Sequence, residues 1–243
     1  MSNPDSAPKS SQYRRLDCAS ILETTERLCR RIGERFPERG LVRVCGALVD
    51  TARSTRDEIA RLAAPNWPLR LAVAALIAAC VVAQLAALRS LHFDGVRTDL
   101  GLIQTLEAVV NLLILFGGAV WFLITLEERV KRRRTLEALH QLRSLAHVID
   151  MHQLTKDPSV LLAPVNRTPT SPEHAMSRFE LTRYLDYCAE MQALVGKLAA
   201  LYAEGVRDAV VIDAINDIEN LAANLGRKIW QKIMILSALE EGA

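Results

Sequence analysis

The stretch LIQTLEAVVNLLILFGGAVWFLITL, residues 102–126, decides the fold class of this 243-residue chain. It is long enough to cross the hydrocarbon core of a bilayer, which takes about 20 predominantly apolar residues in a helix. Trp121 and Phe122 stand near its end, where aromatic side chains commonly lie at the membrane surface. The stretch therefore predicts a transmembrane helix.

A second apolar stretch precedes it. LAVAALIAACVVAQLAAL, residues 71–88, carries no charge and lies between Arg70 and Arg89, whose side chains can reach the headgroups. A buried core helix of a soluble protein is the alternative for either stretch alone, and the presence of two weakens it. We predict a transmembrane hairpin made of a first helix at 68–91, a short external turn at 92–101 and a second helix at 102–126.

Basic residues predict the orientation of this hairpin, because cytoplasmic flanks are richer in Lys and Arg than external ones. Both outer flanks are basic, whereas the connection between the stretches holds only Arg89 and Arg97, with Asp94 and Asp99 among them. We therefore expect a multi-pass protein of the inner (plasma) membrane of a bacterium, with both termini cytoplasmic. Anionic lipid would also attract the basic run, by about 1 kcal/mol per residue, although topological anchoring alone would explain the run: Lys131, Arg132, Arg133 and Arg134.

The rest of the chain is expected to be cytoplasmic and helical, since Ala and Leu are abundant and both favour helix. The expected fold class is an all-α integral membrane protein, in which a two-helix transmembrane hairpin carries cytoplasmic amphipathic, coiled-coil-like helices. Ser171, before Pro172, is the expected N-cap of the last segment. The expected segments are a disordered N-terminus at 1–15, amphipathic helices at 16–64, a continuation of the second span at 127–155, a linker at 156–171 and a helical hairpin at 172–241.

The last helix carries the clearest apolar repeat. Its apolar residues alternate at spacings of four and three over about three heptads, which is typical of a coiled coil. We expect the final hairpin to pack on the long helix or on another subunit, with an oligomer seam formed by Val211, Ile215, Ile218, Ala222, Leu225 and Ile229.

Few residues suggest chemistry. His147 and Asp150, at i and i+3 on one helix, could form a pH-sensitive contact. The alternative is a pair of helix-contact residues beside an apolar stripe. No histidine spacing suits a metal, and no P-loop, Rossmann or hydrolase motif is present. We expect no catalytic residue, no metal and no cofactor.

Polar residues inside the second predicted span are more informative. Gln104, Glu107 and Asn111 fall on one face of the helix. Such residues could line a cation path in an oligomer. Alternatively, Gln104 and Glu107 lie among the outer headgroups and Asn111 bonds a neighbouring helix.

Two functions remain. The first is a non-enzymatic inner-membrane scaffold or signalling component, which forms homo-oligomers through its cytoplasmic helices and holds a cytoplasmic protein partner at the bilayer. The alternative is an oligomeric ion channel or pore-forming effector, with the second span lining the pore. Nucleic acid is not an expected partner, because the net charge is only +2 and no basic stripe is interleaved with aromatic residues.

Overall fold

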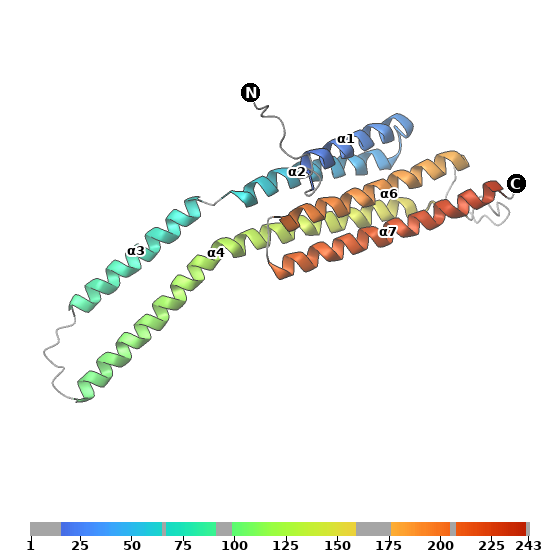
Figure 1. Ribbon diagram of the computed structural model, residues 1–243. Coiled ribbons are helices and arrows are strands. Elements are labelled where there is room, and N and C mark those ends of the chain that lie inside the picture. The colour runs from blue at the N-terminus through green and yellow to red at the C-terminus, as the bar shows by residue number, and fades with distance from the viewer. Residues whose placement is uncertain (1–15, 65–66, 91–98, 159–175, 205–207, 242–243) are drawn as a thin grey trace, which may run out of the picture. The chain divides into compact units, whose positions relative to one another are not determined.

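The computed structural model describes residues 16–64, 67–90, 99–158, 176–204 and 208–241, and this part of the chain is all-helical, without a strand (Figure 1). Two compact units are present: an apolar unit, Ala64–Arg133, and a bundle unit formed by the residues up to Ala63 and from Arg134 onward. The α-helices are α1 (Cys18–Arg35), α2 (Gly40–Ala63), α3 (Trp67–Ser90), α4 (Asp99–Leu154), α6 (Arg178–Leu201) and α7 (Ala209–Glu241).

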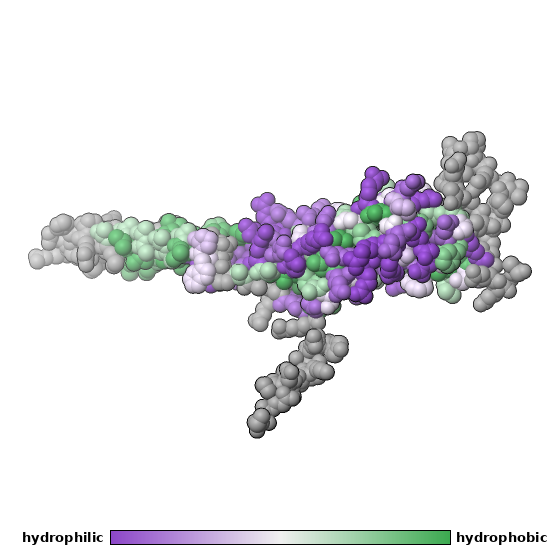
Figure 2. Space-filling view, turned by 90° about the horizontal axis from the view of Figure 1, so that it is seen from above, coloured by the Kyte–Doolittle hydropathy of each residue, from purple (hydrophilic) through white to green (hydrophobic). Residues whose placement is uncertain are grey.

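The apolar unit contains α3 and the first part of α4. From Val109 onward, α4 is long and apolar enough to cross a membrane, and none of its apolar segment is buried within the chain. In α3 the described apolar segment, Arg70–Ala83, is shorter than a span. Among the described residues there is thus one candidate span, which is compatible with membrane association, and the predicted two-span hairpin is not confirmed. The visible face of this unit in Figure 2 is largely hydrophobic, while that of the bundle unit is mainly hydrophilic.

One helix, α4, belongs to both units. The predicted continuation of the apolar stretch into a long helix is confirmed, since α4 runs without interruption to Leu154. Its C-terminal part buries an apolar stripe in the core of the bundle unit: Leu139, Leu142, Ala146 and Ile149.

The central helix of the bundle unit is α6. It contacts α1, α2 and α7, and Gln192 Nε2 donates to the Ala146 carbonyl of α4 at 2.8 Å. A helix that packs on several sides has apolar residues around most of its circumference. Buried apolar residues accordingly occur on more than one face of α6, as Leu181, Leu185, Leu194 and Leu201 show.

The start of α6 differs from the expected one. Ser177 is the N-cap, and its hydroxyl and the Glu180 carboxylate form a capping box with the backbone. The predicted cap at Ser171 and the predicted linker after Pro158 lie outside the described residues. At the opposite end, α6 passes into a 3₁₀ turn at Tyr202–Glu204.

The helices α6 and α7 form a hairpin and pack along their length (Figure 1). The predicted seam lies inside this hairpin, because all six of its residues are buried in the chain itself: Val211, Ile215, Ile218, Ala222, Leu225 and Ile229. We therefore assign this repeat to a contact within one chain, in place of the expected contact between subunits.

The N-terminal helices form a second pair, α1 with α2. Asp17 caps α1 and accepts from the backbone N–H groups of Ala19 and Ser20 at 3.2 and 3.1 Å. The buried residues of the two helices join the same core as α6. Across that contact, Arg31 Nη2 donates to Glu190 Oε1 at 2.6 Å.

Candidate functional site

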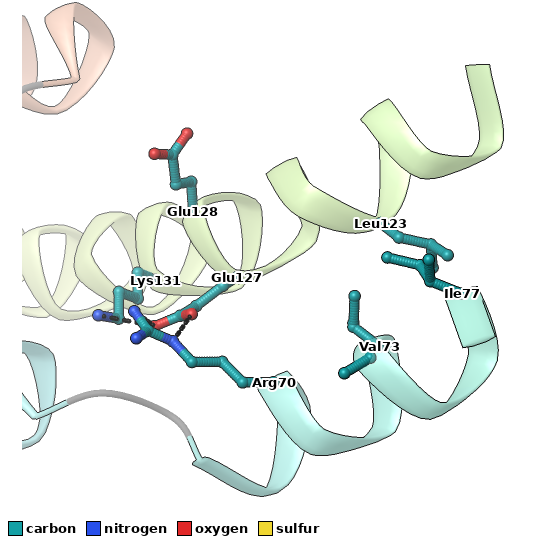
Figure 3. Close-up of a pocket in the computed structure, with 8 residues that line it drawn as sticks. Arg70, Val73, Ile77, Leu123, Glu127, Glu128 and Lys131 are labelled. Atoms are coloured by element: carbon teal, nitrogen blue, oxygen red, sulfur yellow. Dashed lines mark hydrogen bonds and ion pairs between the residues drawn. The ribbon is translucent and has the colours of Figure 1, made fainter. Parts of the chain in front are cut away.

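Three charged side chains join α3 to α4 in the apolar unit (Figure 3). Arg70 Nε donates to Glu127 Oε2 at 2.7 Å, and Lys131 Nζ lies 3.1 Å from Glu127 Oε1. The Glu127 side chain is only 16% exposed and lies between the two cations. A largely buried carboxylate is thus balanced by a cation on each helix, which links the start of α3 to the middle of α4.

A groove of about 500 Å³ opens beside this cluster (Figure 3). Its walls are aliphatic, formed by Val73, Ala74 and Ile77 of α3 and Leu123 of α4, and its charged end carries Arg70, Glu127, Glu128 and Lys131. Among the described residues, no Ser, Thr, Cys, Tyr or His side chain lines the groove. A surface with apolar walls and a charged end suits an amphipathic group, such as the boundary between a lipid chain and its headgroup.

The four residues of the predicted lipid-binding run differ in their surroundings. Lys131 takes part in the ion pair with Glu127. Arg132, Arg133 and Arg134 are exposed. Two residues before Lys131, Arg129 places its guanidinium 5.1 Å from the ring centre of Phe122. Sequence reasoning identified the basic residues and missed Glu127, for which an acidic pair directly after the apolar stretch was the available signal.

The predicted pore-lining residues lie on α4. Glu107 and Asn111 are one helical turn apart, and both are exposed. For Gln104 the helical backbone alone is described.

The predicted contact between His147 and Asp150 gives way to a different network in the bundle unit. Asp150 Oδ1 accepts from Gln153 Nε2 at 2.6 Å, while His147 is exposed. The Gln153 side chain in turn accepts from Lys232 Nζ of α7 at 2.6 Å. Burial lowers the pKa of Lys232. Gln153 and Lys232 were not predicted, because the expected packing of the final hairpin on the long helix did not specify which residues meet.

A different histidine is packed against the core. His152 Cε1 lies 2.8 Å from the position that a Cβ on Gly40 would occupy. Burial, and then the nearby charges of Arg43 and Lys156, lower the pKa of His152. Its backbone carbonyl faces the Tyr184 hydroxyl at 3.4 Å. The surroundings of His152, where α2, α4 and α6 meet, therefore favour its neutral form.

Within the described residues, no group of three or more His, Cys, Asp or Glu side chains is placed to hold a metal ion. Cys18, Cys29, Cys45 and Cys188 are free thiols, and burial raises the pKa of Cys188 to about 12. Comparison with protein-family models, curated proteins and solved structures gives no match to this chain.

Proposed function

We propose that this chain is a non-enzymatic, two-span inner-membrane protein that assembles into homo-oligomers and holds its helical bundle at the cytoplasmic surface as a scaffold or signalling component. The observation that carries the proposal is the double character of α4. One uninterrupted helix begins in an apolar segment that the chain leaves exposed and ends in a stripe buried in the bundle core.

Exposed apolar side chains support membrane insertion. In the apolar unit, large apolar residues on both helices are more than half exposed: Leu71, Leu106, Leu113, Ile114 and Trp121. Contact with water costs about 25 cal/mol per Å² of apolar surface, and exposed patches of this kind mark protein or membrane contacts. Lipid would cover both helices along their length.

The spacing of acidic residues on α4 matches a bilayer. Glu107 and Glu127 are 20 residues apart with no other charge between them, and this separation is about 30 Å along a helix. A typical hydrocarbon core is also about 30 Å thick. With Glu127 and its two cations at the inner surface, Glu107 reaches the outer headgroups, where a carboxylate is hydrated.

Membrane extraction and cysteine labelling test this topology. The protein should remain in the membrane fraction at alkaline pH and dissolve in mild detergent. With a membrane-impermeant maleimide, Asp94→Cys in the predicted external turn should react in intact cells. The matched variant Asn220→Cys, on the exposed surface of α7, should react only after permeabilisation. Recovery in the aqueous fraction without detergent, or labelling of Asp94→Cys from the inside alone, would contradict the proposal.

An ion channel is the second candidate, and the exposure of Glu107 and Asn111 on one face of α4 favours it. In a channel those side chains would face a lumen shared by several copies. Glu107→Gln should then change cation conductance in reconstituted bilayers, with oligomer size unchanged. A scaffold would give no conductance with either Glu or Gln at position 107. If Glu107 lies among the outer headgroups, Glu107→Gln would leave the conductance unchanged.

A further inference from the structure

A groove of about 540 Å³ runs between α6 and α7 on the bundle unit. Small residues from both helices form its floor, which lets a partner approach the two backbones closely: Ala189, Ala193, Gly196, Ala222, Ala223 and Gly226. An added Cβ at Gly226 would have no atom within 4 Å. The chain's own side chains thus leave this space unfilled.

A buried acceptor belongs to the same groove. Gln192 lines it and is fully buried. Its amide nitrogen donates to the Ala146 carbonyl, whereas its Oε1 has no hydrogen-bond partner among the described residues. A buried acceptor without a donor is unfavourable by about the desolvation cost of the group, so such oxygens nearly always have a partner. A donor that enters the groove is the candidate partner for this oxygen.

The groove also carries an exposed hydrogen-bond donor. Trp230 lies at its edge and is 55% exposed. Its indole N–H can donate and cannot accept. A protruding ring beside a hollow of small residues is a self-complementary surface: in a two-fold contact, each copy offers its ring to the hollow of the other.

The rim of the groove fits the same arrangement. Lys197 stands on α6, while Glu219 stands on α7 across the groove, and both are exposed. In a two-fold contact, Lys197 of one copy can face Glu219 of the second copy. Opposite charges so placed help to set the register of an interface.

We propose that this groove binds a second copy of the chain, with Trp230 of each copy inserted between α6 and α7 of the other and its indole N–H donating to Gln192 Oε1. This contact is the homo-oligomer interface of the proposed function and rests on it. It replaces the repeat that the sequence suggested, which the chain itself buries.

Filling the groove tests the proposal. The oligomer size of the purified full chain is measured by light scattering in mild detergent over a range of protein concentrations. Gly226→Leu adds a side chain into the groove, and we expect at least a tenfold weaker self-association. Gly33→Leu is the matched control, since Gly33 on α1 also has no atom within 4 Å of an added Cβ, and it should associate as the wild type does. Equal association of the two variants would overturn the proposal.

Charge reversal adds a second, independent measurement. Lys197→Glu and Glu219→Lys should each weaken association severalfold, and the double variant should recover it, because the pair is restored in the opposite sense. Failure of the double variant to recover would contradict the two-fold contact. A monomeric wild type would also overturn it and leave the groove to another partner.

Membrane extraction of the same samples separates the two proposals. If Gly226→Leu is unchanged in oligomer size but still needs detergent, the groove interface alone is refuted. If the wild type dissolves without detergent and still associates through the groove, the membrane function fails and the interface stands.

Discussion

The bundle unit should depend strongly on the C-terminal part of α4, and two isoleucines on this one helix measure that dependence. Ile149 is fully buried in the bundle core, whereas Ile114 in the apolar segment is 68% exposed. Ile149→Ala removes buried methyl and methylene groups and leaves a cavity, which typically costs 2–5 kcal/mol. Taking about 3 kcal/mol, and about 2–4 °C per kcal/mol for a unit of this size, the Tm should fall by about 6–12 °C.

The assay is thermal unfolding in mild detergent, followed by circular dichroism at the helical band. Ile114→Ala makes the same chemical change at an exposed site and should alter the free energy of unfolding of the bundle by less than about 0.5 kcal/mol. Equal Tm values for Ile149→Ala and the wild type would show that α4 does not belong to the bundle core. A similar loss of stability in both variants would refute the division of α4 between two units.

Three further predictions follow from local contacts. Since the pKa of His152 is lowered, the unfolded state binds more protons than the folded state between that pKa and about 6.5, and stability should fall as the pH falls through this window. His152→Gln should make the Tm less dependent on pH in this window. His140→Gln, at an exposed site, is the control for the loss of an imidazole. Gly40→Ala should destabilise the wild type by about 1 kcal/mol, because the added methyl group overpacks against His152. The same substitution should stabilise the His152→Ala variant, where the methyl group has room. Destabilisation of both proteins would exclude the contact between Gly40 and His152. Ser177→Ala should cost about 1 kcal/mol by removing the N-cap of α6, and Ser177→Asp should restore most of it in urea unfolding, because Asp is an equally good cap.

Helical periodicity predicted the apolar stripes well. Leu139, Leu142, Ala146 and Ile149 are all buried. Of the apolar residues at helical spacings in α2, Leu41, Val44 and Leu48 are buried, while Ile59 and Leu62 are partly buried. These residues repeat at the helical period, and a helix with one apolar face has to bury that face somewhere. The continuity of α4 was also predictable, because the sequence holds no proline or glycine between Gly118 and Pro158.

The partners of those stripes could not be predicted. The repeat on α7 has the spacing of a coiled coil, and that spacing does not distinguish a helix of the same chain from a helix of another. This difference changes the expected effect of Ile218→Asp. Between subunits, the substitution would disrupt an oligomer. Because Ile218 is buried within the chain, we expect the substitution to unfold the bundle by burying a charge.

The site depended on long-range contacts for the same reason. The hydrogen bond from Arg70 to Glu127 spans 57 residues of sequence, and that from Lys232 to Gln153 spans 79. The orientation of the Gln192 amide, which leaves its oxygen without a partner among the described residues, is set by the hydrogen bond from its nitrogen to the Ala146 carbonyl on α4. No local pattern in the sequence contains such information.

The central position of α6 has a consequence for biosynthesis. Arg31 of α1 and its partner Glu190 of α6 are separated by 159 residues. At about 5–20 residues per second, a ribosome needs roughly 10–30 s to make that interval. During this time the first two helices have been synthesised while their packing partner has not, and both predicted spans emerge in between. Nascent chains halted before residue 178 should therefore expose the inner faces of α1 and α2 to chaperones and proteases.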